Sequence, residues 1–328
     1  MKLLVTGGLG FIGSNFIKQC VQSHSVINQD RMSIGSNPMS LRELEDNKNY
    51  RFVKGDINDV NLVSSFLDEV DAVVNFAAET HVDRSIRDPA PFIESNIHGT
   101  YSLLEAERKV GKKVRHIQVS TDEVYGSCVG DPFKETDTLN PSNPYSATKA
   151  SADLLCRAYH TTYGLDVLIT RCTNNYGPNQ FPEKLIPKTI IRALHSLPIP
   201  VYGTGEAVRD WLYVGDHCNA IMQVLKNGVS GEVYNVSAGN EVSAIGMVKQ
   251  ILGLLEKPES LITYVQDRPG HDMRYSLDSS KLRSALGWKP EHGFGDALRK
   301  TVDWYRMNEG WWRPLTSAEV LHPTPWKA

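Results

Sequence analysis

The stretch Thr6-Gly7-Gly8-Leu9-Gly10-Phe11-Ile12-Gly13-Ser14 decides the fold of this 328-residue chain. It follows the apolar run Lys2–Thr6, which is typical of a strand, and it opens a helical pattern over residues 11–23. Glycines at this spacing suit a turn whose backbone approaches a pyrophosphate while the helix N-terminus faces the phosphates. We therefore predict a dinucleotide site. Its expected contacts here are Gly7, Gly10, Phe11, Ile12 and Gly13.

An acidic residue lies where such a site needs one. Asp30 comes at the end of the next expected strand, where a carboxylate can accept hydrogen bonds from both hydroxyls of the adenosine ribose. The same charge repels a 2′-phosphate and favours NAD over NADP, although Arg31 beside it weakens that preference. Asp56 and Ile57 follow the third expected strand and would flank the adenine, with an ordinary acidic turn as the alternative.

Short β-branched runs alternate with helical patterns through the first half of the chain. This alternation predicts an α/β fold, a Rossmann-like doubly wound parallel sheet with helices on both faces. Proline-rich and glycine-rich loops after residue 170 predict a smaller, loop-rich C-terminal substrate lobe. We expect a dinucleotide domain over 1–170, with returning segments near 212–237, and a mainly substrate-binding lobe over 171–328, interleaved with it. The tail from Arg313 should be an extended surface strap or a frayed end.

These expectations cover the following ranges. The expected strands are 2–6, 25–29, 51–54, 72–77, 115–120 and 167–170. The expected helices are 11–23, 60–68, 91–110, 145–163, 214–226, 244–255 and 294–307.

Charge, cysteine content and hydropathy exclude several classes of partner. A net charge of −3 provides no basic field for nucleic acid, so local cations must hold any anionic ligand. Five widely spaced cysteines without a C-x-x-C pair argue against a disulfide framework and a zinc site, and His81 and His217 lack metal-ligand spacing. No apolar run is long enough for a membrane span or a signal peptide. We expect a cytoplasmic protein without a metal or a membrane partner.

Tyr145 and Lys149 share one face of an expected helix that Asn143 caps and Pro144 begins. The Lys149 ammonium would lower the pKa of the Tyr145 phenol, which could then take a proton from a sugar hydroxyl while hydride leaves for nicotinamide. The same spacing occurs by chance in many helices. The dinucleotide motif upstream favours the catalytic interpretation, in which both residues also contact the cofactor.

With TGGLGFIGS at the start and YSATK in the middle, the chain resembles the extended short-chain dehydrogenases/reductases. That resemblance implies a Rossmann domain and a tyrosine base. It does not select one reaction, because nucleotide-sugar epimerases, decarboxylases, reductases and dehydratases share both motifs.

Thr121, Asp122 and Glu123 directly follow the expected strand 115–120, at the sheet edge where ligands of such folds bind. Strand alternation would turn Asp122 away from its neighbours, so the backbone must leave the strand here if all three are to face a substrate. Two adjacent carboxyl groups in a closed site can titrate apart, one as an acid and one as a base. An acidic helix start is the alternative interpretation.

The segment STDEVYG resembles that of the dTDP-glucose 4,6-dehydratases, whereas related decarboxylases typically carry serine in place of Asp122 and epimerases usually lack both acids. The predicted reaction oxidises the sugar at C4, after which Glu123 abstracts the C5 proton and Asp122 protonates the leaving C6 hydroxyl. Hydride then returns to C6, Thr121 holds the C4 oxygen, and tightly bound NAD is regenerated. The alternatives are UDP-glucose as substrate, a 4-epimerase or decarboxylase, and a catalytically idle NAD-binding protein.

Further matches to these dehydratases run along nearly the whole chain: NFAAETHVDRSI (75–86), NPYSATKASAD (143–153), NNYGPNQFPEKLIP (174–187), RDWLYVGDH (209–217) and DRPGHDMRYS (267–276). Besides the residues given above, the expected cofactor contacts are Met32, Ser33, Phe76, Ala77, Ala78, Glu79, Ser95 and Asn175. The implied contacts of the nucleoside diphosphate hexose, besides the catalytic acids, are Thr80, Asn174, Lys184, Leu185, Pro200, Val201, Tyr202, Arg209, Asn235, Asp267, Arg268, Pro269, Gly270 and His271.

Three of these residues also make physical sense as local cations. Lys184, Arg209 and Arg268 could hold a diphosphate in a slightly acidic protein, with solvated surface charge as the alternative. The resemblance further implies a homodimer packed through the expected helices 91–110 and 145–163. One loop departs from the family pattern, since Arg31-Met32-Ser33-Ile34-Gly35-Ser36-Asn37 replaces a tyrosine-containing loop, and this puts contacts on the adenosine side in doubt.

Overall fold

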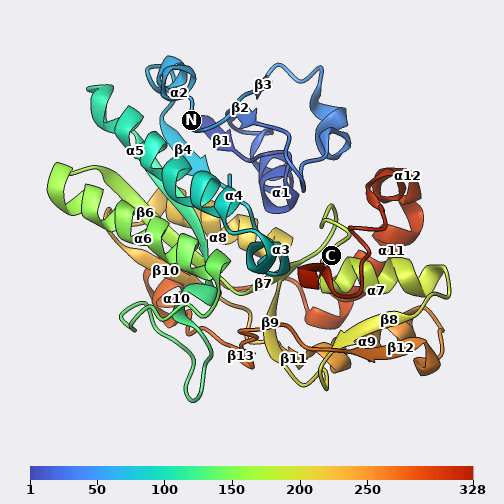
Figure 1. Cartoon of the computed structure of the whole chain (residues 1–328). Helices are drawn as coiled ribbons and strands as arrows, with labels where there is room; N and C mark the ends of the chain where they lie inside the picture. The colour runs from blue at the N-terminus through green and yellow to red at the C-terminus, as the bar shows by residue number, and fades with distance from the viewer. Residues whose placement is uncertain (328) are drawn as a thin grey trace.

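The computed structural model describes residues 1–327 and contains the predicted doubly wound sheet (Figure 1). Seven parallel strands lie in the order β10-β6-β5-β4-β1-β2-β3. The strands are β1 (Lys2–Thr6), β2 (Ser25–Asp30), β3 (Tyr50–Lys54), β4 (Ala72–Asn75), β5 (Arg115–Thr121), β6 (Asp166–Cys172) and β10 (Val233–Val236). The strand order changes direction at β1 and β4, and crevices at such a switch point bind ligands in these folds.

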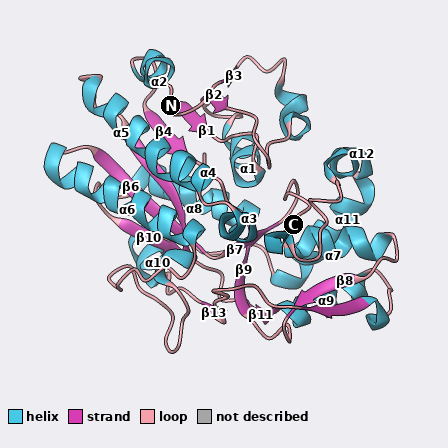
Figure 2. Cartoon of the chain, viewed as in Figure 1, coloured by secondary structure: helices cyan, strands magenta, loops and turns pink. Residues whose placement is uncertain are grey.

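Helices cover both faces of this sheet, as Figure 2 shows. Strand alternation divides β1, whose Leu3 and Val5 pack on one face while Leu4 packs on the other. The first face is covered by α1 (Phe11–Cys20) and α8 (Val214–Asn227), and the second by α2 (Val60–Leu67), α5 (Gly99–Lys109) and α6 (Pro144–Tyr163). Each face therefore has its own apolar core.

A second group of elements forms the substrate side of the molecule. Its sheets contain β7 (Asn174–Tyr176), β9 (Val208–Tyr213), β11 (Glu241–Ser243) and β13 (Arg274–Tyr275), and separately β8 (Ile199–Tyr202) with β12 (Ile262–Val265). Its helices are α7 (Leu185–Leu194), α9 (Ala244–Leu254), α11 (Phe294–Met307) and α12 (Glu309–Trp312). The shorter elements are η1 (Pro38–Leu44), α3 (Val82–Arg87), α4 (Ala90–Phe92), η2 (Ile93–His98), η3 (Asp122–Tyr125), η4 (Glu259–Leu261), α10 (Ser280–Leu286), η5 (Arg313–Leu315) and η6 (Pro325–Lys327).

Several element boundaries differ from the sequence predictions. The expected helix 91–110 is three consecutive pieces, because a π-helical turn over η2 lies between α4 and α5. Helix α7 was not predicted, since Pro187 suggested a loop. Proline is tolerated in the first turn of a helix, where the backbone N–H groups have no helical partner. Strand β10 was also missed as a separate strand, although it lies in the segment expected to return to the first domain.

The C-terminal tail is packed rather than frayed. Its carbonyls at Leu321 and His322 accept hydrogen bonds from Arg192 (2.6 Å) and Lys188 (3.1 Å) on α7. The final turn, η6, packs against α3, and Figure 1 places the C-terminus beside that helix. The tail is therefore a strap that joins α7 to α3.

Candidate active site

The glycine-rich turn over residues 7–13 brings backbone segments into close contact, as the sequence predicted. Gly7 has a φ of 69°, and a Cβ there would lie 2.6 Å from the Ala77 nitrogen. A Cβ on Gly13 would lie 2.6 Å from the Gly7 carbonyl oxygen. Neither position can take a side chain without shifting backbone. The turn lines a large cavity, here called the dinucleotide cavity, at the carboxyl ends of β1, β2 and β4.

Asp30 lies in this cavity and already organises its rim. One carboxylate oxygen accepts hydrogen bonds from the Met32 nitrogen (2.7 Å) and the Ser36 hydroxyl (2.8 Å), and the other accepts from the Leu9 nitrogen (3.0 Å). The departing loop 31–37 is thus tied to the acid that the sequence predicted for the ribose. Ser33 lines the cavity, whereas the side chain of Met32 is 41% exposed and is not among the lining residues.

Arg31 is held away from Asp30 by two other acids. Its guanidinium pairs with Glu79 at 2.7 Å and with Asp56 at 3.2 Å. These three residues and Ile57 line the adenosine end of the cavity together with Phe76, Ala77, Ala78 and Ser95. The cation that raised doubt about NAD over NADP is therefore neutralised inside the protein.

Asn96 is a buried residue that the sequence analysis missed. Its side-chain carbonyl accepts from the Glu79 nitrogen (2.8 Å), and its amide donates to the Glu79 carbonyl (3.1 Å) and to the Thr148 hydroxyl (2.9 Å). It lies on the π-helical turn, which no sequence pattern signalled. Asn96 fixes the segment 76–79 against α6.

The backbone leaves strand β5 after Thr121, as predicted, and enters the turn η3. The Thr121 hydroxyl donates to the Asp122 carboxylate (3.0 Å) and accepts from the Glu123 nitrogen (3.3 Å). The second carboxylate oxygen of Asp122 is buried and has no partner within residues 1–327. Glu123 also lies 3.4 Å from the hydroxyl of Tyr275, which donates at 2.6 Å to Asp272. Tyr275 was missed as a site residue, although it lies inside the quoted motif DRPGHDMRYS.

The two acids have different environments. Burial raises the pKa of Asp122 well above its ordinary value, and the charge of Glu123 raises it further. Burial also raises the pKa of Glu123, but the charges of Arg268, Arg209 and Lys184 lower it. The pair is therefore arranged so that Asp122 keeps its proton more readily than Glu123 does.

Tyr145 and Lys149 both line the dinucleotide cavity on α6, which Asn143 caps and Pro144 begins as predicted. The predicted lowering of the Tyr145 pKa is wrong for this structure. Burial and the charges of Glu123, Cys172 and Asp122 raise that pKa well above its ordinary value, and only a hydrogen bond with Thr121 lowers it. Lys149 is itself buried, which lowers its pKa, and it donates to the Val119 carbonyl at 2.7 Å.

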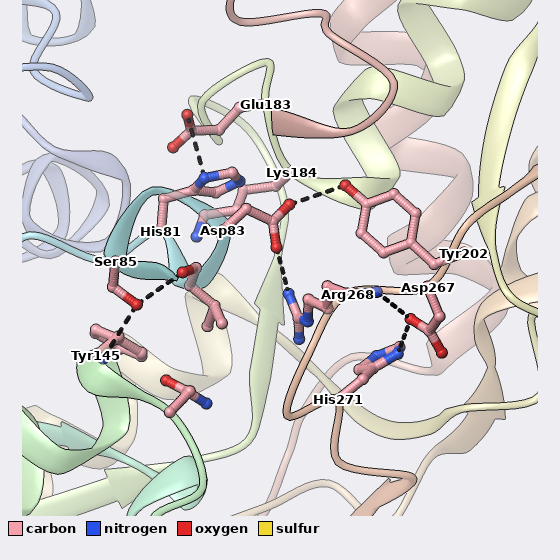
Figure 3. A network of polar contacts seen from close by, with 12 residues as sticks. His81, Asp83, Ser85, Tyr145, Glu183, Lys184, Tyr202, Asp267, Arg268 and His271 are labelled. Atoms are coloured by element: carbon pink, nitrogen blue, oxygen red, sulfur yellow. Dashed lines mark hydrogen bonds and ion pairs between the residues drawn. The ribbon is translucent and has the colours of Figure 1, made fainter. Parts of the chain in front are cut away.

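A second cavity, here called the substrate cavity, adjoins the first. Glu123, Asn174 and Lys184 are among the residues that line both, so the cavities meet beside Glu123. Thr80 lines only the dinucleotide cavity. The other predicted substrate residues that line the second cavity are Leu185, Pro200, Val201, Tyr202, Arg209, Arg268 and His271. Figure 3 shows part of its polar wall, where Arg268 and Tyr202 both point at Asp83.

Four predicted substrate contacts are not lining residues of either cavity: Asn235, Asp267, Pro269 and Gly270. The Asn235 amide is buried and satisfied internally, accepting from the Tyr125 hydroxyl (3.0 Å) and donating to the Phe133 carbonyl (2.9 Å). Asp267 accepts from the Arg268 nitrogen (2.8 Å) and pairs with His271 (2.7 Å). Asp267 thereby shapes the loop that carries Arg268 and His271.

Asn175 lines the dinucleotide cavity and accepts from the buried His217 at 3.0 Å. Burial lowers the pKa of His217 to about 3, so the ring is neutral and serves as a hydrogen-bond donor.

All five cysteines are free and buried. Over residues 1–327, the structure contains no group of three or more His, Cys, Asp or Glu side chains suited to a metal ion. In the same range, no helix has the length and apolar character required to cross a membrane.

Comparisons with known proteins agree with this geometry. Residues 4–301 match the family model of GDP-mannose 4,6 dehydratase. The dTDP-glucose 4,6-dehydratase of Xanthomonas campestris pv. campestris (strain B100) is 51% identical over 94% of both chains, and that of Streptomyces niveus is 46% identical over 99% of this chain and 98% of its own. The chain belongs to the dTDP-glucose 4,6-dehydratase family.

Solved structures place the chain in the same family. The dTDP-glucose 4,6-dehydratase DesIV from Streptomyces venezuelae, crystallised with NAD, superposes with a TM-score of 0.94 at 46% identity, covering 96% of this chain and all of DesIV. A UDP-glucuronic acid 4-epimerase from Bacillus cereus has a TM-score of 0.89 but only 28% identity over 94% of this chain and 99% of its own. The epimerases thus share the fold, and the dTDP-glucose 4,6-dehydratases share much more of the sequence.

Proposed function

We propose that this chain is an NAD-dependent dTDP-glucose 4,6-dehydratase that forms dTDP-4-keto-6-deoxyglucose and water. The observation that carries the proposal is the placement of two adjacent acids in the dinucleotide cavity: Asp122 lines it, Glu123 lines it and the substrate cavity as well, and the pKa values of the two acids are raised to different extents. A dehydration needs a proton donor and a proton acceptor on the same substrate at once. Hydride transfer alone, as in an epimerase, needs neither acid.

The dinucleotide cavity fits NAD. Gly7 and Gly13 leave room for a pyrophosphate beside the backbone, and Asp30 at the ribose end repels a 2′-phosphate. The ion pairs of Arg31 with Glu79 and Asp56 leave it poorly placed to bind such a phosphate. When bound, NAD would supply a hydride acceptor for the sugar C4 and return the hydride to C6, which keeps the cofactor in place between turnovers.

Tyr145 is the proposed base for the C4 hydroxyl. It is buried, and its hydrogen bond with Thr121 lowers its pKa while the neighbouring carboxylates raise it. The positive charge of oxidised nicotinamide, rather than Lys149 alone, would favour the ionised form of Tyr145. Lys149 is fixed by the Val119 carbonyl beneath the same cavity, where it can orient a ribose. Thr121 would then donate to the C4 oxygen.

The elimination is assigned to the acid pair. Burial raises the pKa of Glu123, but three nearby cations oppose that rise, so Glu123 takes the C5 proton once C4 is a ketone and later returns it. Asp122 stays protonated because it is buried beside Glu123, and it donates that proton to the leaving C6 hydroxyl. Each proton therefore has a named donor and acceptor in the chain.

The diphosphate is assigned to the substrate cavity. Lys184, Arg209 and Arg268 line it, and arginine forks bind phosphate oxygens in pairs. Residues 1–170 with segments near 212–237 would then hold NAD, and the remainder would mainly hold the nucleotide sugar.

We further expect a homodimer packed through neighbouring helices. Ile93 and Tyr101 on the η2–α5 segment, and Leu154 and Tyr163 on α6, are large apolar side chains that are 44–54% exposed. Burying such residues is a common basis of stable self-association. Sedimentation of the wild type beside Leu154→Glu tests this, with a shift to monomer as the expected result.

The five free thiols fit the reducing cytoplasm where we expect the enzyme to work.

Incubation of the purified protein with dTDP-glucose and, separately, UDP-glucose tests the proposal. We expect dTDP-glucose to lose the mass of one water without added reductant, and the product to show the alkaline absorbance of a 4-keto-6-deoxy sugar. Loss of water from UDP-glucose instead would change the assigned base but not the reaction. Unchanged mass with both would return the assignment to an epimerase or an idle NAD-binding protein.

A further inference from the structure

Helix α3 (Val82–Arg87) connects three parts of the active site through consecutive residues. Asp83 accepts hydrogen bonds from Arg268 (2.9 Å) and Tyr202 (2.8 Å) of the substrate side. Arg84 pairs with Glu183, next to Lys184, at 3.0 Å, and the Ser85 hydroxyl accepts from the backbone nitrogen of Tyr145 at 3.1 Å. Figure 3 shows the Asp83 and Ser85 contacts, and both residues belong to α3.

Asp83 is the side-chain anchor of Arg268. The Asp83 side chain is 3% exposed and that of Arg268 is 15% exposed. Within residues 1–327, the Nη1 bond to Asp83 is the only hydrogen bond of this guanidinium, and its Nε is buried without a partner. Burial lowers the pKa of Arg268, but the charges of Asp83 and Glu123 raise it above its ordinary value. The guanidinium is thus charged and fixed through Nη1, while Nη2, which is not among the buried unpaired atoms, has no hydrogen-bond partner within residues 1–327.

We propose that Asp83 is a positioning residue for nucleotide-diphosphate binding, which holds Arg268 so that its unpaired edge faces the substrate cavity. The inference rests on the proposed function and adds a residue that the sequence analysis did not select. Asp83 lines the cavity, but it carries the same sign of charge as the diphosphate. Its contribution is therefore made through Arg268 and Tyr202.

The opposite role is physically possible and predicts the opposite result. If Asp83 only competed with phosphate for Arg268, its removal would free the cation and tighten binding. Two observations favour positioning. Arg268 lines the substrate cavity, and its Nη2 has no hydrogen-bond partner within residues 1–327 while Nη1 is bound to Asp83, so no competition is needed. Arg268 also lies on a loop with a positive-φ glycine, Gly270, and without Asp83 its long side chain would have many rotamers to lose on binding.

The C-terminal strap reinforces this arrangement. Trp326 packs edge to face on Tyr202 with ring centroids 4.8 Å apart, and Tyr202 donates to the second oxygen of Asp83. The aspartate is thereby held from two sides. Because η6 also packs on α3, the strap and the helix together support the Arg268 side chain.

The test compares Asp83→Asn with wild type in the NAD-loaded enzyme. Loss of a charge-assisted hydrogen bond corresponds to roughly a tenfold loss of affinity, so we expect KM for dTDP-glucose and the inhibition constant of dTDP to rise about tenfold. Thymidine, which lacks phosphates, should inhibit both proteins equally, and kcat should change less than about twofold. A purely structural defect would weaken thymidine as well and would lower kcat.

The matched control is Asp166→Asn. Asp166 is a similarly buried carboxylate paired with Arg115 at 3.1 Å, at the amino ends of β5 and β6 and outside both cavities. We expect it to leave dTDP inhibition unchanged. Asp83→Glu keeps the charge and should recover part of the lost affinity, and Tyr202→Phe should raise the dTDP constant by a smaller factor even if Asp83→Asn folds poorly.

The outcomes separate this inference from the function on which it rests. If wild type itself neither binds dTDP nor converts dTDP-glucose, the proposed function fails. If wild type does both, while Asp83→Asn binds dTDP as tightly or more tightly, the positioning role is overturned. A selective loss of dTDP affinity in Asp83→Asn, absent from Asp166→Asn, supports it.

Discussion

The dinucleotide cavity and the substrate cavity are built in different ways. In the first, a single run from Gly7 to Gly13 supplies a backbone turn, and the carboxyl ends of neighbouring strands supply the rest. In the second, the polar wall is made of charged side chains that come from α3, the start of α7, β9 and the loop at 267–271. Glu123 belongs to both. Close approach of backbone therefore shapes the dinucleotide cavity at Gly7 and Gly13, whereas charged side chains form the polar wall of the substrate cavity.

The largest expected effect comes from Glu123, one of the residues that line both cavities. Glu123→Gln removes the proposed base for C5, and general-base catalysis contributes about 10²–10⁴-fold, so kcat should fall by that order. NAD content and dTDP binding should remain, because neither depends on the proton. The control is Glu232→Gln, an acid paired with Lys281 outside both cavities, which should turn over normally. Near-normal turnover of Glu123→Gln would rule out its role.

The next effect separates backbone from side-chain construction. Gly13→Ala places a methyl group 2.6 Å from the Gly7 carbonyl oxygen, so the purified variant should lose most of its NAD, measured by absorbance after denaturation. Gly253→Ala in α9 is the matched control, because its Cβ would meet nothing within 4 Å, and it should retain NAD. Full NAD occupancy in Gly13→Ala would contradict the claim that the close approach of backbone segments at Gly7 and Gly13 is required for NAD binding.

A smaller effect should appear in stability against pH. The folded-state pKa of Asp122 is raised, so the folded protein binds more protons than the unfolded chain between the ordinary value of 3.8 and the raised value. The contribution of Asp122 to the free energy of unfolding is fully present below this pH range, and it is lost as the pH rises through the range. Asp122→Asn removes the penalty and should raise Tm by about 2 °C at neutral pH, with a smaller difference near pH 4. Calorimetry at both pH values checks this, and equal or lower Tm at neutral pH would contradict it.

The smallest effect is expected at the departing loop. Arg31 makes partly exposed ion pairs, and such pairs contribute about 0–1 kcal/mol, so Arg31→Ala should weaken NAD binding by at most about fivefold. It should not create a preference for NADP, because Asp30 remains. The comparison is Arg306→Ala, whose partner Asp303 lies on the surface of α11. A gain of NADP binding in Arg31→Ala would show that the ion pairs hold the specificity.

The dinucleotide half of the site could be predicted from sequence because its determinants are local. The order of strand, glycines, helix and acid fixed the parallel sheet, the turn at Gly7 and the place of Asp30. The departure of the chain from β5 at Thr121 followed from strand alternation together with the condition that Thr121, Asp122 and Glu123 all face a substrate. What failed was the Tyr145 pKa, because burial and two nearby carboxylates outweigh a lysine that is directed to the Val119 carbonyl.

The substrate half could be predicted only in part. Sequence resemblance gave Arg209 and Arg268, but nothing in the sequence indicated that Asp83 lies between Arg268 and Tyr202, since their contacts join residues far apart in the chain. Asn235 shows the reverse error. It was expected at the substrate, yet the fold places its amide between Tyr125 and Phe133. Such pairings depend on tertiary packing.

The central claim is that one site oxidises, dehydrates and reduces the same sugar without releasing the hydride. The most direct test follows dTDP-glucose carrying deuterium at C4 through the reaction, with the product analysed by mass and by NMR. The account predicts a product lighter by one water, with the deuterium retained at C6. A product of unchanged mass, or one that has lost the deuterium to solvent or to added NAD, would contradict it.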